Sequence, residues 1–254
     1  MSDVRLRART VSEIVDAAFA LYRRDAGQYI LIMAVCSVPR LVAQLLWQRP
    51  PSDFMAHPEA ALPTLAIALV SAFTFTVGDA AIMKYGAEVY LGQPADSAQT
   101  VRAVIPKVVL ILFAGFLKGL LYFVGFLCLI VGMAYVAARF FALTQVIVLE
   151  DAGLDDAFAR SSELSSGRKR HILNTLLLVY IIYWLLSLCV VVLGGFAQST
   201  VVTIVLGTVF SIVAYPIIAL AGMVLYYDCR IRNEGYDIEH MAAAMDRPPA
   251  PAAT

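Results

Sequence analysis

Long apolar stretches, separated by short charged segments, make up most of the chain. Six of these stretches are long enough for a helix across the hydrocarbon core, which takes about 20 mostly apolar residues. Backbone amides in lipid must find hydrogen-bond partners within the chain, so helices are the expected spanning elements. The expected spans cover residues 29–47, 65–84, 108–124, 126–149, 172–193 and 201–227. The sequence therefore predicts an all-α fold, a polytopic membrane helix bundle with six transmembrane helices.

The third and fourth expected spans are almost continuous. A single helix over residues 108–149 would be about 63 Å long at 1.5 Å per residue, twice the thickness of the hydrocarbon core. We therefore predict a tight turn near Gly125 that folds these two spans back on each other.

Three amphipathic segments, 10–24, 96–107 and 153–170, precede pairs of spans. In the first, Thr10 and Glu13 match a capping box, and Ile14 and Leu21 fall on one helical face. Such segments are typical of helices that lie in the membrane interface. The stretch DAAFA at 16–20 is similar to DDAFA at 155–159, which suggests three tandem units of an amphipathic helix and a hairpin. Chance or shared helix composition explains so short a match equally well.

Lysine and arginine gather on alternate connecting segments, which predicts the orientation in the membrane. The N-terminal segment, the segments after the second and fourth spans, and the C-terminal end are rich in basic residues. Of the alternate connections, one carries Arg49 and the short turn GGFAQST carries no basic residue. We expect a multi-pass protein of the cell inner membrane with both termini, and the amphipathic helices, on the cytoplasmic side.

The first twenty residues are too charged for a cleavable signal peptide, so the first span is expected to serve as an uncleaved anchor. We expect a single integral membrane domain over residues 1–240. Residues 241–254, which end in RPPAPAAT, are expected to form a flexible cytoplasmic tail.

The composition agrees with lipid as the surrounding solvent. Hydrophobic residues make up 61% of the chain and charged residues 15%, against about 45–50% and about 25% in soluble domains. The formal net charge is zero, so nucleic acid is not an expected partner. The three histidines are scattered and the cysteines form no CxxC pair, which predicts neither a metal site nor a cofactor. We interpret the cysteines as small apolar residues: Cys36, Cys128, Cys189 and Cys229.

Charges within the spans cost about 2.5–3.5 kcal/mol each on insertion scales, which makes them candidates for function. The candidate intramembrane charges are Arg40, Asp79, Lys118, Arg139 and Glu150. Arg40 follows Pro39, which loosens the helix, and it either snorkels outward or joins the wall of a polar cavity. Asp79 is either a partnered structural carboxylate near Lys84 or part of a proton relay.

Lys118 lies beside a GxxxG face made by Gly115 and Gly119, whose simpler use is close helix packing. Arg139 is expected near the middle of the fourth span, where a lone guanidinium is costly and needs a partner. Asp79 or a backbone carbonyl is the expected partner. Two interpretations of Arg139 stay open: a buried structural ion pair, or contact with an anionic lipid or substrate.

A dense charge cluster follows the last span directly, in the stretch LYYDCRIRNEGYDIEHM at 225–241. Asp228 and Arg232 are four residues apart, as are Arg230 and Glu234, which predicts two ion pairs along one helix. Gly235 is expected to end that helix.

Other charges are expected to join this cluster. Glu150 closes the fourth span, and with Arg160 it is expected to meet Arg230 at the cytoplasmic mouth of the bundle. Asp237 is expected to cap a short following helix. The cluster is either a structural clamp or a docking site for a lipid head group or a partner. The candidate polar or lipid-contact residues are Arg139, Glu150, Arg160, Asp228, Arg230, Arg232 and Glu234.

Three segments are similar to the bacterial integral membrane family named the glycerophosphoryl diester phosphodiesterase membrane domain, and to related uncharacterised membrane families. They are EIVDAAFALYRR, RFFALTQVIVLEDAGLDDAFARSSELSSGRKRHIL and YYDCRIRNEGYDIEHM. The resemblance implies a six-helix membrane bundle. In some relatives this unit is fused to a soluble phosphodiesterase domain that holds the active site, so the resemblance does not imply catalysis by this chain.

The sequence leaves three functions open for this chain. The expected one is a non-catalytic scaffold or accessory unit that binds membrane lipids or a membrane or cytoplasmic protein partner. A transporter or lipid translocator would use Arg40, Asp79 and Arg139 along a cavity, with Pro39 and Pro216 as helix breakers. A membrane enzyme acting on phosphodiesters would need convergent carboxylates and histidines. The sequence offers no such set and no GxxxxGK[ST], HExxH or GxSxG motif, so no enzyme is expected.

Overall fold

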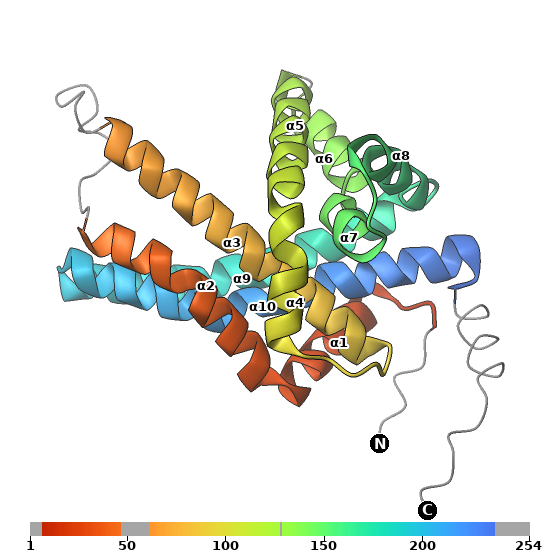
Figure 1. The fold of residues 1–254 in the computed structure, drawn as a ribbon. Coiled ribbons are helices and arrows are strands. Elements are labelled where there is room, and N and C mark those ends of the chain that lie inside the picture. Colours follow the sequence, from red (N-terminus) through yellow and green to blue (C-terminus); the bar gives the residue numbers. More distant parts are fainter. Residues whose placement is uncertain (1–6, 47–60, 128, 237–254) are drawn as a thin grey trace, which may run out of the picture.

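The computed structural model describes residues 7–46, 61–127 and 129–236 (Figure 1). Helices account for nearly all of these residues, and no strand occurs among them. The helices are α1 (Val11–Arg24), α2 (Ala26–Leu46), α3 (Ala61–Tyr90), α4 (Ser97–Val104), α5 (Val108–Leu127), α6 (Leu129–Arg139), α7 (Leu143–Leu149), α8 (Leu154–Leu164), α9 (Lys169–Ala197) and α10 (Thr200–Glu234), with a 3-10 helix η3 (Ile105–Lys107) before α5. Six helical stretches are long and apolar enough to cross a membrane. The predicted all-α membrane helix bundle is confirmed.

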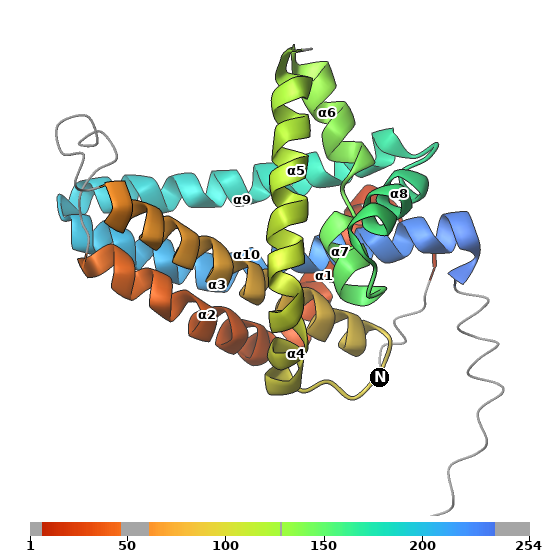
Figure 2. The ribbon, with the colours of Figure 1, turned by 45° about the horizontal axis from the view of Figure 1, so that its top comes forward.

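The helices follow one another as three similar units. Each hairpin of long helices, α2–α3, α5–α6 and α9–α10, comes after a shorter amphipathic helix, α1, α4 or α8 respectively. This order agrees with the tandem units expected from the DAAFA and DDAFA stretches. The α2–α3 and α9–α10 hairpins extend side by side, whereas α5 and α6 stand at a wide angle to them (Figures 1 and 2).

The hairpins converge at one end, which we call the base: α1, α4, α7, α8, the beginning of α2 and α9, and the second half of α10 (Figure 2). The long helices α3 and α10 extend beyond their predicted apolar ends into this base. Apolar burial is concentrated there, as several large and fully buried side chains show: Ile14, Tyr29, Ile147, Leu164 and Tyr226.

The parts of the hairpins away from the base expose large apolar side chains. Among the most exposed are Phe123 in α5, Ile130 in α6, Trp184 in α9 and Phe196 near the end of α9. Exposed apolar surface on this scale is expected where lipid tails, and not water, surround the helices. This pattern supports a membrane environment for all three hairpins.

Helix α1 begins with the predicted capping box. The Thr10 hydroxyl accepts from the Glu13 backbone N–H at 3.4 Å, and Glu13 accepts from the Thr10 backbone N–H at 2.7 Å. That backbone hydrogen bond and the nearby Arg7 guanidinium lower the pKa of Glu13 to about 2. Because the pKa is depressed, this contribution to folding is complete above the ordinary value of 4.5 and is lost as the pH falls towards 2.

The turn between α5 and α6 lies slightly later than predicted. Helix α5 continues through Gly125 to Leu127, and α6 begins at Leu129. Gly125 is used for close approach instead of for a turn, since a Cβ atom there would lie 2.9 Å from the backbone of Gly132. A sequence pattern cannot separate these two uses of a glycine near a helix end.

The fourth predicted span is not one continuous helix. It is interrupted after Arg139, at residues 140–142, and α7 then starts at Leu143. A side chain of α8 satisfies the backbone groups freed by the break: the Ser161 hydroxyl accepts from the Ala142 N–H at 3.2 Å and donates to the Arg139 carbonyl at 3.2 Å. Arg139 therefore lies at the end of α6 and near the middle of the candidate span Ile130–Leu149, as predicted, but at a break in the helix that was not predicted.

The crossing of α5 and α6 gives a first prediction. A methyl group at position 125 would press on the backbone of Gly132, which cannot move aside as a flexible side chain can. We expect Gly125→Ala to lower the free energy of unfolding by about 1–3 kcal/mol, measured by denaturation of the protein in detergent. Gly119→Ala is the control, because a Cβ atom there meets nothing within 4 Å. Equal destabilisation by both substitutions would contradict the close crossing.

Candidate functional site

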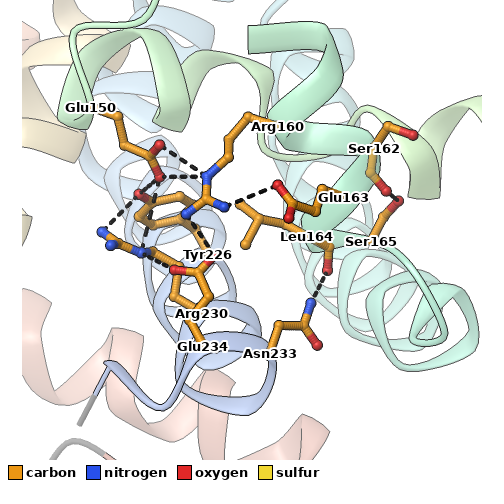
Figure 3. A network of polar contacts seen from close by, with 10 residues as sticks. All are labelled: Glu150, Arg160, Ser162, Glu163, Leu164, Ser165, Tyr226, Arg230, Asn233 and Glu234. Atoms are coloured by element: carbon orange, nitrogen blue, oxygen red, sulfur yellow. Dashed lines mark hydrogen bonds and ion pairs between the residues drawn. The ribbon is translucent and has the colours of Figure 1, made fainter. Parts of the chain in front are cut away.

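The largest group of ion pairs lies in the base, where α7, α8 and α10 meet (Figure 3). Glu150 follows α7 and contacts Arg160 of α8 at 3.1 Å and the Tyr226 hydroxyl of α10 at 2.5 Å. Arg230 lies 4.0 Å from Glu150 and 3.1 Å from Glu234. These five residues, Glu150, Arg160, Tyr226, Arg230 and Glu234, are called the Glu150 cluster.

Arg160 connects the two carboxylates of this cluster. One terminal nitrogen lies 2.5 Å from Glu234, and the other lies 3.1 Å from the exposed Glu163 (Figure 3). Burial disfavours the charged guanidinium, but the carboxylates of Glu150 and Glu234 outweigh burial and raise the pKa of Arg160. Two arginines and two glutamates that are largely shielded from water thus neutralise one another. The predicted meeting of Glu150, Arg160 and Arg230 is confirmed.

A second cluster surrounds Asp228, whose side chain is fully buried. One carboxylate oxygen accepts from the Arg9 backbone N–H at 2.6 Å, and the other accepts from Arg232 at 2.8 Å and contacts the His171 ring at 3.1 Å. Arg232 also donates to the Arg9 carbonyl at 2.6 Å. This Asp228 cluster of Arg9, His171, Asp228 and Arg232 joins the beginnings of α1 and α9 to α10.

Both predicted ion pairs along α10 are present, Asp228 with Arg232 and Arg230 with Glu234. Gly235 ends the helix with a φ of +66°, a left-handed conformation that glycine adopts without strain. Asp237, the expected cap of a following helix, lies outside the described residues.

Three contributors to the base were not predicted from the sequence. His171 and the backbone of Arg9 bind Asp228 although they are far from it in the sequence. Lys107, which follows α4, pairs with Asp151 and donates to the Val148 carbonyl at 3.0 Å. The one available signal was the basic character of these segments, which does not identify a partner. The Asp228 contacts join the start of α9 and the segment before α1 to α10. The Lys107 contacts join the start of α5 to the end of α7.

Arg139 has neutral partners in place of the expected carboxylate. Its guanidinium donates to the Ser162 hydroxyl at 3.0 Å and to the Tyr135 hydroxyl at 2.9 Å. Asp79 accepts instead from the Tyr215 hydroxyl at 3.0 Å, so the predicted pairing of Arg139 with Asp79 is wrong. The physical reason is the break after α6, which places Arg139 beside α8. Arg139 also lies outside the Glu150 cluster with which it was grouped.

The other intramembrane charges have separate surroundings. Lys84 pairs with Glu88 at 3.9 Å and not with Asp79. Lys118 lies 5.9 Å from the centre of the Tyr122 ring. Within the described residues, Arg40 makes no hydrogen bond or ion pair.

The GxxxG face beside Lys118 is not used for packing within the chain. A Cβ atom at Gly115 or at Gly119 would meet nothing within 4 Å. Close helix packing inside the bundle, the simpler use expected of this pair, therefore does not occur in the structure.

Among the described residues, no group of three His, Cys, Asp or Glu side chains is arranged to hold a metal ion. Comparisons of the chain with protein-family models, with curated proteins and with solved structures return no match. A function can therefore be inferred only from the geometry of the base and of the spans.

The Glu150 cluster gives a second prediction. Removing the Glu150 carboxylate leaves two shielded guanidinium groups, those of Arg160 and Arg230, with fewer acceptors. We expect Glu150→Ala to lower the free energy of unfolding by about 1–3 kcal/mol, measured by thermal unfolding in detergent. Glu163→Ala is the control: this carboxylate also contacts Arg160 but is 71% exposed, so its loss should cost about 0.5 kcal/mol. The cluster would be of no structural consequence if the two variants unfolded at the same temperature.

Proposed function

We propose that the chain is a non-catalytic, multi-pass component of a bacterial inner membrane, a scaffold or accessory unit that binds membrane lipids or a partner protein through its base. The observation that carries the proposal is the mutual neutralisation of charges from different units in the Glu150 and Asp228 clusters. Breaking such contacts costs free energy because charged groups are left shielded and unpaired. Contacts of this kind favour one fixed arrangement of the three hairpins.

The orientation proposed for this scaffold places the base and both termini in the cytoplasm. The basic residues of the base support it, because cytoplasmic segments carry an excess of lysine and arginine. The resemblance to the glycerophosphoryl diester phosphodiesterase membrane domain family supports a six-helix membrane bundle and does not imply catalysis by this unit.

A transporter is the second candidate, and one observation favours it. Asp79 in α3 accepts a hydrogen bond from Tyr215 in α10, in the apolar part of two spans, and Pro216 directly follows that tyrosine. Carboxylates at such positions occur in proton and ion pathways. Transport by alternating access would require the hairpins to move relative to one another, and with them the base.

Spin-label distances distinguish the two candidates. Ala20, Ala103 and Ala159 are exposed and lie on α1, α4 and α8, one in each unit. Pairs of labels at these positions, in a variant without native cysteines and in lipid vesicles, should give one narrow distance distribution per pair. We expect the distributions to stay unchanged under a proton or sodium gradient. Two populations that exchange under a gradient would overturn the scaffold and favour transport.

The orientation has its own test. Single cysteines at Ser166, in the corner between α8 and α9, and at Ser199, between α9 and α10, should lie on opposite sides of the membrane. In intact spheroplasts, an impermeant maleimide should label the cysteine at 199 and leave the one at 166 unlabelled. Inverted membrane vesicles should show the reverse, and the opposite result in both preparations would place the termini outside the cytoplasm.

A further inference from the structure

A run of three basic residues, Arg168, Lys169 and Arg170, occupies the corner between α8 and α9. Gly167 precedes them with a φ of +71°, which turns the chain sharply. Residues 167–171 line a basin of about 490 Å³ that is widely open to the surface. The basin lies where α9 enters its apolar stretch, so it belongs to the membrane-facing border of the base.

The cations of this basin differ from those of the two clusters because their partners are neutral. Arg168 donates to the Asn233 side-chain oxygen at 2.9 Å, and the Lys169 ammonium lies 4.8 Å from the centre of the Tyr135 ring. Arg170 is exposed. In the described part of the chain, none of the three is paired with a carboxylate. Within the described residues, the basin therefore keeps positive charge that no carboxylate neutralises.

Two further groups add to this positive character. The Arg139 guanidinium donates to the hydroxyl of Tyr135, the same tyrosine whose ring Lys169 contacts. Within the described residues, Arg139 also has no carboxylate partner. No side chain caps the N-terminus of α9 at Arg168, so amides of its first turn can receive an acceptor from outside. Both features suit a phosphate group.

An apolar crevice lies between α1, α9 and α10. It is narrow, with a volume of about 30 Å³, and, apart from the ring of Tyr183, aliphatic side chains and one phenylalanine line it. Its walls include Val15 and Phe19 of α1, Val179 and Leu186 of α9, and Ile217 and Ala221 of α10. The apolar lining of this half-open crevice suits a hydrocarbon chain that lies along it.

Arg168 and His171 of the basin lie on the same side of α9 as the crevice, whereas Lys169 and Arg170 follow at about 100° and about 200° around the helix from Arg168. Eleven residues separate Arg168 from Val179, and eleven separate His171 from Ile182, which is about three helical turns or about 16 Å. One leaflet of the hydrocarbon core is about 15 Å thick, half of about 30 Å. A lipid whose head group lies at the basin therefore has chains long enough to reach the crevice within the same leaflet.

We propose that this pair of cavities binds one anionic phospholipid, with its phosphate against Arg168, Lys169 and Arg170 and one acyl chain in the crevice between α1, α9 and α10. The charge of the basin selects an anion, and the crevice selects one that carries a hydrocarbon chain. This inference rests on the proposed function as a lipid-binding membrane scaffold, and it names the lipid class and the site.

Native mass spectrometry of the purified protein in detergent tests the head-group contact. Phosphatidylglycerol and phosphatidylcholine with identical chains are added separately. We expect one phosphatidylglycerol to be retained in preference to phosphatidylcholine. Each basic residue near the membrane surface contributes about five-fold to such binding, so Lys169→Ala with Arg170→Ala should weaken retention about 25-fold. Arg102→Ala, which removes an exposed cation of α4 elsewhere in the base, is the control and should retain the lipid as the wild type does.

The chain contact has a separate pair of variants. Ala214 lines the crevice from α10, and Ala214→Phe should fill it and reduce retention of phosphatidylglycerol. Ala214→Leu should reduce it less, which provides a milder variant if the larger ring impairs folding. Val213→Phe is the control, since Val213 is 44% exposed and does not line the crevice.

Several results would overturn the site. Equal retention of both lipids, or undiminished retention by the Lys169 and Arg170 double variant, would exclude the basin as the head-group contact. Displacement of the lipid by millimolar inorganic phosphate would indicate a site for free phosphate, and undiminished retention by both Ala214 variants would exclude the crevice. If the lipid results exclude the site and each pair of spin labels in the base still gives a single distance distribution under a gradient, the lipid site fails and the scaffold stands. If the pairs give two distributions that exchange, the scaffold itself fails.

Discussion

The three hairpins are joined mainly at the base, because the parts of the spans away from it bury little surface against one another. Much of α9 and of the first half of α10 is exposed, and in lipid no hydrophobic effect drives such helices together. At the base, by contrast, Asp228 is fully buried and must be neutralised by groups from other helices. That requirement brings the first residues of α1 and of α9 against α10. The Glu150 cluster does the same for α7 and α8.

Much of this arrangement could be predicted from the sequence, because lipid restricts the possibilities. Length and apolarity define the spans, and the i,i+4 spacing along α10 defines two ion pairs that the structure contains. The meeting of Glu150, Arg160 and Arg230 could be predicted as well, since only one end of each span was expected to carry several charges. These inferences need local periodicity and the side of the membrane, and both can be derived from residue order.

The missed features depend on three-dimensional contacts. The interruption after α6 exists because the Ser161 hydroxyl of α8 satisfies both backbone groups that the break frees. A serine nineteen residues away from Ala142 gives no sign of this in the sequence. The wrong partner assigned to Arg139 follows from the same break, and His171 was passed over because a lone histidine before an apolar stretch has many uses. The tail from 241 onward lies outside the described residues.

The clamp and the docking site were alternatives for the charged segments, and the proposed lipid site assigns them to different residues. The Glu150 and Asp228 clusters use their carboxylates on arginine and histidine from neighbouring helices, so they hold the base together. Arg139, Arg168, Lys169 and Arg170 receive no carboxylate within the described residues, and they lie together around Tyr135 and the start of α9. Both kinds of charge are required at one place, because a site for an anion needs cations that are held in position and yet left unneutralised. The paired clusters join α8, α9 and α10, and in the proposed site they hold these remaining cations in position for a phosphate.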